Sequence, residues 1–207
     1  MFHSVVTGTA LLASLAATAA VPSSSVVSAP PPGKVTVKVV SANGSGCPRG
    51  STTVSASPGN RSFTITYRRF TAASGPGVAA IGFRKNCQLA LDVSGPRGWT
   101  WAISRIGSSG SAGLRRGASG MQVSSFYWAG DPRTVRVEHK FAGPLDGRWE
   151  RSRKIAKKSL RYMPCGQRRY LNVNLELRVT PGSATGRNSL TMDSTSGSVF
   201  EVVWRKC

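Results

Sequence analysis

The sequence has few acidic residues and almost no histidine. Its 207 residues include eight Asp and Glu and two His, and His139 is the only histidine beyond position 3. A Ser-His-Asp triad or a His-rich metal site would therefore depend on this one residue. His139 is in phase with Val135 and Val137, so we interpret it as a buried or sheet-edge side chain rather than a general base. We assign no catalytic residues and expect no metal site and no cofactor.

Two hypotheses other than a binding protein remain open. A small secreted hydrolase acting on carbohydrate or lipid is the first, and glycoside hydrolysis would need two carboxyl groups facing each other. The best candidate pair is Asp193 with Glu176, although the phase of Glu176 along its segment indicates a solvated face. A secreted inhibitor or toxin acting on a protein partner is the second. The Gly/Ser-rich stretch 107–113 lacks the Gly-Lys-Ser of a phosphate-binding loop, so we interpret it as a flexible hairpin loop.

No apolar run is long enough to cross a membrane. The run Val5 to Ala17 falls short of the roughly 20 residues that a spanning helix needs. Small residues at Ala17 and Ala19 follow it, which predicts a signal peptide over 1–19. Residues 20–33 are rich in Pro and Ser and predict a linker, followed by one domain over 34–207. We expect a secreted, extracellular protein without a transmembrane segment.

Long uninterrupted helical stretches are also missing, and period-two alternation takes their place. In the segment 170–180, one face is apolar throughout, with Leu171, Val173, Leu175, Leu177 and Val179. Comparable alternation occurs around residues 35–39, 63–67, 89–93, 99–103, 121–128, 134–141 and 198–204. The fold class predicted is all-β, a two-layer antiparallel β-sandwich of about nine or ten strands. Only Gly147–Met163 has spacing that suggests a short helix.

Four cysteines in an exported chain indicate two disulfides rather than a metal site or a catalytic thiol. Each cysteine lies at least about 40 positions from the next, unlike the close pairs of structural zinc sites. Three pairings are possible. We favour Cys47 with Cys87 and Cys165 with Cys207, because sequential pairing of neighbouring strands is the simplest arrangement.

Several motifs occur in the order found in a known family. They are Gly44-Ser45-Gly46-Cys47-Pro48, Phe83 to Leu89, Pro164-Cys165-Gly166, Asn172 to Val179, and the ending Met192 to Cys207. Together they resemble the secreted family named domain of unknown function 4360, over the whole mature domain. The resemblance implies a secreted protein with cysteines at these places. It implies no activity and transfers no site residues.

Positive charge is the most distinctive feature that remains. The chain has 28 Lys and Arg and a formal net charge of +20, which favours contact with polyanions. The densest cluster comprises Arg148, Arg151, Arg153, Lys154, Lys157, Lys158, Arg161, Arg168 and Arg169. Trp149 and Tyr162 lie among these charges and could stack on a ligand. An Arg-rich composition without a ligand is the alternative explanation.

The first hypothesis is therefore a noncatalytic extracellular or cell-envelope binding module. Its basic surface would bind an anionic polysaccharide, a wall polymer or another polyanion. No recognition helix, zinc finger or RNA-binding motif accompanies the charge, so we do not expect sequence-specific binding of nucleic acid.

Overall fold

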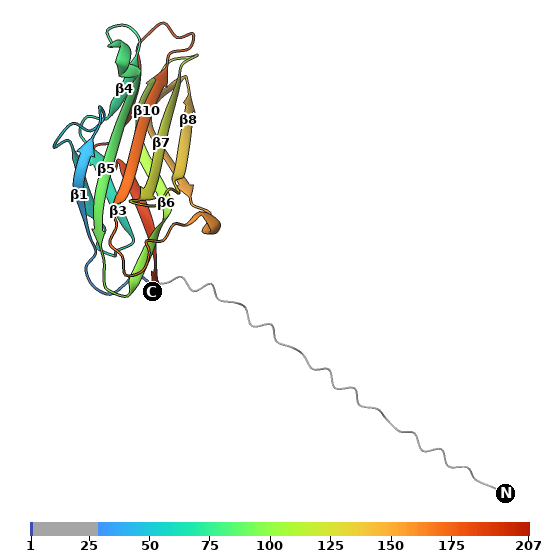
Figure 1. Ribbon diagram of the computed structural model, residues 1–207. Helices are drawn as coiled ribbons and strands as arrows, with labels where there is room; N and C mark the ends of the chain where they lie inside the picture. Colours follow the sequence, from blue (N-terminus) through green and yellow to red (C-terminus); the bar gives the residue numbers. More distant parts are fainter. Residues whose placement is uncertain (2–28) are drawn as a thin grey trace.

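The computed structural model describes Met1 and residues 29–207. This part of the chain folds into twelve β-strands and two short 3-10 helices, arranged as two antiparallel sheets packed face to face (Figure 1). The predicted two-layer β-sandwich is confirmed. Apart from Met1, the predicted signal peptide and most of the predicted linker lie outside the described residues, so those boundaries stay predictions.

One layer is a five-stranded sheet. In spatial order it contains β1 (Thr36–Asn43), β5 (Arg84–Ser94), β10 (Leu171–Thr180), β7 (Ser119–Trp128) and β8 (Val135–Ala142). The central strand β10 is therefore paired on both sides, and β8 forms an edge.

The other layer is a seven-stranded sheet built around the 16-residue strand β6 (Trp99–Leu114). The order along one path is β2 (Thr52–Ala56), β3 (Ser62–Tyr67), β12 (Ser198–Lys206), β6, β11 (Asn188–Met192) and β4 (Thr71–Ser74). The last strand, β9 (Leu145–Lys154), pairs with β6 alone. The 3-10 helices are η1 (Ala80–Phe83) and η2 (Lys157–Ser159).

Alternate residues of both sheets form the core between them. The five apolar side chains of β10 predicted to share one face are each no more than 2% exposed. From the facing sheet, Trp101 packs edge-on against Trp128 with ring centroids 4.8 Å apart. Phe63 stacks on Phe200 at 4.9 Å. Period-two burial thus explains the sheets directly, since successive side chains of a strand point to opposite faces.

The prediction of a flexible hairpin loop at 107–113 is wrong, because these residues belong to the second half of β6. A β-carbon at Gly110 would lie 1.9 Å from the carbonyl oxygen of Thr191 and 2.7 Å from the ring of Trp149. Glycine at this position lets β11 and the Trp149 indole approach the strand closely. The run of small residues therefore reflects packing rather than flexibility.

The helix suggested for Gly147–Met163 is also wrong. Residues 145–154 form β9, and only Trp149 of this strand is fully buried. An edge strand paired on one side has few positions that must be apolar, so its sequence lacks the alternation that identifies a buried strand. The single turn of η2 follows.

Two disulfides close the sandwich, and both pairings favoured from the sequence are confirmed. Cys47 bonds to Cys87 with a Cα–Cα distance of 5.3 Å, and Cys165 bonds to Cys207 at 5.7 Å. The first ties the segment after β1 to β5, and the second ties the end of the chain to the loop before β10. Within the described residues, no helix has the length and apolar character that crossing a membrane requires.

Candidate functional site: the basic edge

The open edge of the sandwich between β8 and β9 carries a group of cations. Strand β9 contributes Arg151, Arg153 and Lys154, and η2 contributes Lys157 and Lys158. All five side chains are exposed. We call these five residues the basic edge. They come together because β9 has no strand on its outer side and runs directly into the η2 turn.

The cations of the basic edge are not paired with carboxylates of the described chain. Within residues 29–207, none of its five side chains forms an ion pair with a carboxylate. Arg151 is the best held of the five: its guanidinium carbon lies 5.4 Å from the ring centroid of Phe141. The same guanidinium donates a hydrogen bond of 2.9 Å to the carbonyl oxygen of Glu150.

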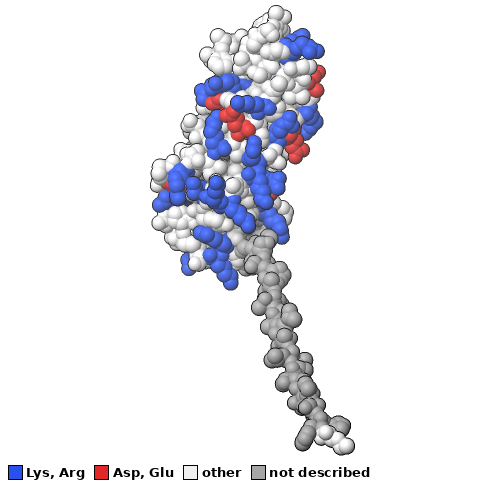
Figure 2. All heavy atoms as spheres, turned by 90° about the vertical axis from the view of Figure 1, so that its right-hand side faces the viewer, with Lys and Arg blue, Asp and Glu red and all other residues white. Residues whose placement is uncertain are grey.

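A cleft of about 370 Å³ adjoins these cations, with β8 on one side and the end of β9 on the other. Its lining includes Arg153 and Lys154 opposite Arg136 and Glu138. The hydrogen bond from Arg136 keeps the pKa of Glu138 below its usual range, and Lys140 adds to this effect. In Figure 2, Lys and Arg side chains spread over this side of the molecule, and acidic side chains occupy much smaller areas.

Four residues of the predicted cluster do not belong to the basic edge. Arg148 pairs with Asp193 at 2.7 Å, and Arg168 pairs with Asp92 through its Nε at 3.1 Å. Arg169 donates to Gln167 and to the carbonyl oxygen of Ala129. Arg161 is half-buried, and its backbone carbonyl accepts a hydrogen bond from the indole of Trp128. Arg168 and Arg169 lie in the loop that leads into β10, so proximity in sequence overstated the size of the cluster.

His139 occupies the interior side of the β8 edge. Its side chain is buried, with 8% exposed, as the sequence predicts for a structural histidine. Burial lowers the pKa of His139, and the positive charges of Arg153 and Arg151 lower it further. These effects favour the neutral form of the imidazole beneath the basic edge.

Asp193 and Glu176, the candidate carboxylate pair, are not brought together: Asp193 lies in a turn of the seven-stranded sheet and Glu176 on a strand of the five-stranded sheet. Asp193 follows β11 and shapes the turn before β12, where its Oδ1 accepts hydrogen bonds from the backbone of Thr195 at 2.7 Å and Ser196 at 3.1 Å. The Thr195 hydroxyl, those two N–H groups and Arg148 hold the pKa of Asp193 well below its usual range.

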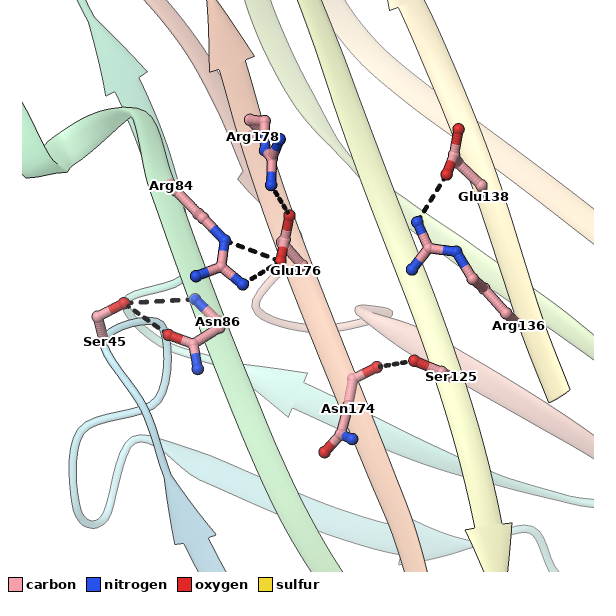
Figure 3. A network of polar contacts seen from close by, with 9 residues as sticks. All are labelled: Ser45, Arg84, Asn86, Ser125, Arg136, Glu138, Asn174, Glu176 and Arg178. Atoms are coloured by element: carbon pink, nitrogen blue, oxygen red, sulfur yellow. Dashed lines mark hydrogen bonds and ion pairs between the residues drawn. The ribbon is translucent and has the colours of Figure 1, made fainter. Parts of the chain in front are cut away.

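Glu176 lies on the outer face of the five-stranded sheet, where Arg84 and Arg178 both bind it (Figure 3). Partial burial raises the pKa of Glu176, but the hydrogen bond and charge of Arg84, aided by Arg178, outweigh burial and lower it. Both carboxylates are thus fixed as ionised structural groups, and the hydrolase hypothesis loses its candidate pair.

A second hollow, of about 550 Å³, was not anticipated from the sequence. It lies over β6 at Gly107 and Ser109, and its lining includes Arg105, Glu201 and Arg148. Arg105 pairs with Glu201 at 3.3 Å. The charges here are balanced within the chain, so this hollow differs from the basic edge. A glycine in mid-strand was its only signal in the sequence.

Comparison with known proteins decides the family. A family model described as "Domain of unknown function (DUF4360)" matches residues 33–207. The chain belongs to this family. An uncharacterised secreted protein of Arthroderma benhamiae (strain ATCC MYA-4681 / CBS 112371) is 31% identical over 182 residues, which cover 86% of this chain and 74% of the relative. This DUF4360 protein is accordingly secreted, as predicted.

Solved structures resemble it only distantly. A carbohydrate-binding module in complex with β-1,4-galactotriose is 9% identical with a TM-score of 0.30, covering 84% of this chain and 88% of the module. The enzymatically active domain of bacteriophage CBA120 tailspike protein 4 is 11% identical with a TM-score of 0.23, covering 84% of this chain and 19% of that one. Similarity at this level does not guide the assignment of function.

Proposed function

We propose that this DUF4360 protein is a noncatalytic extracellular binding module that holds anionic polymers along its basic edge. The observation that carries the proposal is the set of five exposed cations, Arg151, Arg153, Lys154, Lys157 and Lys158, without a carboxylate partner in the described chain. Cations without a carboxylate partner keep their charge available to a ligand.

The physical basis is electrostatic. Each Lys or Arg that neutralises an anionic group on a polymer releases a condensed counterion, which drives association at low salt. Arg151 and Arg153 can in addition donate paired hydrogen bonds to a carboxylate, sulfate or phosphate group. The cleft beside β8 gives an extended polymer a place to lie against the strand.

Charged side chains on an edge strand also prevent pairing with other sheets, so the test must separate a ligand site from edge protection and from net charge. The test variant replaces all five basic-edge residues with Gln. The matched control also loses five positive charges, but at exposed positions outside the basic edge. Its substitutions are Arg49→Gln, Arg69→Gln, Arg97→Gln, Arg116→Gln and Arg187→Gln.

The measurement is the salt concentration that elutes each protein from columns of polygalacturonate, heparin and immobilised polyphosphate. These columns present carboxylate, sulfate and phosphate groups respectively, and the column that retains the wild type most strongly identifies the anion class. We expect the basic-edge variant to elute at a much lower salt concentration than the control variant. Equal elution of the two variants would mean that net charge alone acts, and would refute the site.

A further inference from the structure

The outer face of the five-stranded sheet contains an uncharged area that the fold does not explain. Strand pairing places Asn174 between Gln88 on β5 and Ser125 on β7. One row further along, Asn172 lies beside Tyr127, and Tyr170 precedes it on the same face. We call these six residues, Gln88, Ser125, Tyr127, Tyr170, Asn172 and Asn174, the neutral platform.

The amide groups of the platform have no structural task. Within residues 29–207, the side-chain amides of Gln88, Asn172 and Asn174 make no hydrogen bond to the protein. Ser125 bonds the backbone carbonyl of Asn174, whose amide points away from Ser125 in Figure 3. Asn is depleted in β-strands, yet β10, the central strand of the sheet, presents two at successive outward positions. A merely solvated face would not require them.

Aromatic rings lie next to these amides. Tyr170 is 46% exposed, although it is a large side chain with an apolar ring. Tyr127 is half-buried beside Asn172. An exposed tyrosine offers a flat apolar surface and a polar hydroxyl, which suits a ligand that has both C–H faces and hydroxyl groups.

The charged side chains that border the platform include several ion pairs. Glu176 lies between Arg84 and Arg178 beyond one end, and Asp92 binds Arg168 beyond the other. On the β8 side, Arg136 pairs with Glu138 at 2.7 Å. In a chain of net charge +20, this area is bordered by ion pairs and contains no charge of its own. It does not match an anionic ligand.

We infer that the neutral platform binds an uncharged polysaccharide lying across strands β5, β10 and β7. Carboxamides donate and accept hydrogen bonds, as sugar hydroxyls do, and the tyrosine rings supply stacking surfaces. With strands about 4.8 Å apart and residues about 3.4 Å apart along a strand, the platform measures about 10 by 14 Å. That area accommodates a short stretch of a sugar chain. The site is separate from the basic edge.

The test is isothermal titration of the purified protein with soluble β-glucan, galactan, mannan and arabinoxylan in 0.5 M NaCl, which screens attraction to anions. We expect at least one of these polymers to bind. The double variant Asn172→Ala, Asn174→Ala and the single variant Tyr127→Ala should each lower its affinity at least tenfold. Thr180→Ala, an exposed position on the same strand beyond Arg178, should bind as the wild type does.

Two further variants keep the outcome clear. If the alanine double variant unfolds, Asn172→Thr with Asn174→Thr preserves strand propensity and removes the amides. The five-fold Gln variant of the basic edge should retain full affinity for the neutral polymer. Absence of binding to all four polymers, wild-type affinity in the folded platform variants, or loss of affinity in the basic-edge variant would each overturn the inference.

Discussion

The neutral platform and the basic edge use charge in opposite ways. Six of the eight acidic residues form ion pairs, and four of these six lie on the five-stranded sheet or in the turn between β7 and β8: Asp92, Asp131, Glu138 and Glu176. None of the six reaches the five cations of the basic edge. Most of the paired carboxylates thus lie on or beside the five-stranded sheet, and none of them pairs with the basic edge.

Exposed ion pairs stabilise a protein by only about 0–1 kcal/mol each, so this distribution is not explained by stability. Its effect is on the surface potential. Each arginine that borders the platform contacts a carboxylate, whereas Arg151 and Arg153 of β9 contact none within residues 29–207. Two surfaces of different character are therefore available to ligands on one β-sandwich.

The largest expected difference between the two surfaces is in how the affinity for their ligands depends on salt concentration. If a phosphate polymer contacts all five basic-edge cations, its affinity should fall on the order of 100-fold between 50 and 200 mM NaCl, by the counterion-release slope for single-stranded phosphate polymers. Affinity for a neutral polysaccharide should change less than about twofold, because no counterions are released. Titration of the wild type with each polymer across this range measures both slopes. Equal slopes would mean that one surface serves both ligands.

The second prediction concerns β9, the strand that carries the basic edge. Gly110→Ala should reduce the free energy of unfolding by about 1–3 kcal/mol, because the added methyl group collides with Trp149 and with the backbone of β11. The matched control is Gly107→Ala in the same strand, where the nearest atoms, those of Val199, lie 3.9 Å from the new β-carbon. Urea unfolding of the two variants and the wild type gives the difference. Equal losses would show that glycine at 110 is not required for the packing of Trp149.

The sequence predicts the buried strands of this structure much better than it predicts the edge strand β9. The buried strands were predictable because an apolar face must alternate; β10 shows this most clearly. Strand β9 was not, since an edge strand with one buried tryptophan carries no alternation. Five of the nine predicted cationic residues form the basic edge because they follow one another along the chain.

The platform depends on strand register. Gln88, Ser125 and Asn174 are far apart in the sequence and become neighbours only when β5, β10 and β7 align. The alternation along β10 places Asn172 and Asn174 on the face opposite its apolar residues, but it does not show which residues lie beside them. Ion pairs such as Arg148 with Asp193 also join residues that are distant in the sequence, so the sequence does not reveal them. Without them, the basic cluster is predicted to be larger than it is.

The smallest predicted effect links pH to the basic edge. Because burial and the charges of Arg153 and Arg151 lower the pKa of His139 in the folded protein, the unfolded chain binds a proton at higher pH than the folded chain does. Stability due to the neutral imidazole is therefore present above the unfolded pKa of about 6.5 and is lost as pH falls below it.

The free energy of unfolding, measured by urea titration from pH 7.5 to 5, should decrease in the wild type. His139→Gln should flatten this dependence, and the five-fold Gln variant of the basic edge should weaken it, because two of the charges that disfavour protonation are gone. An identical pH dependence in all three proteins would show that the histidine does not sense the cations above it. The platform, on the other side of the same sheet, should bind its neutral ligand equally well throughout this range, because it contains no carboxylate and no histidine.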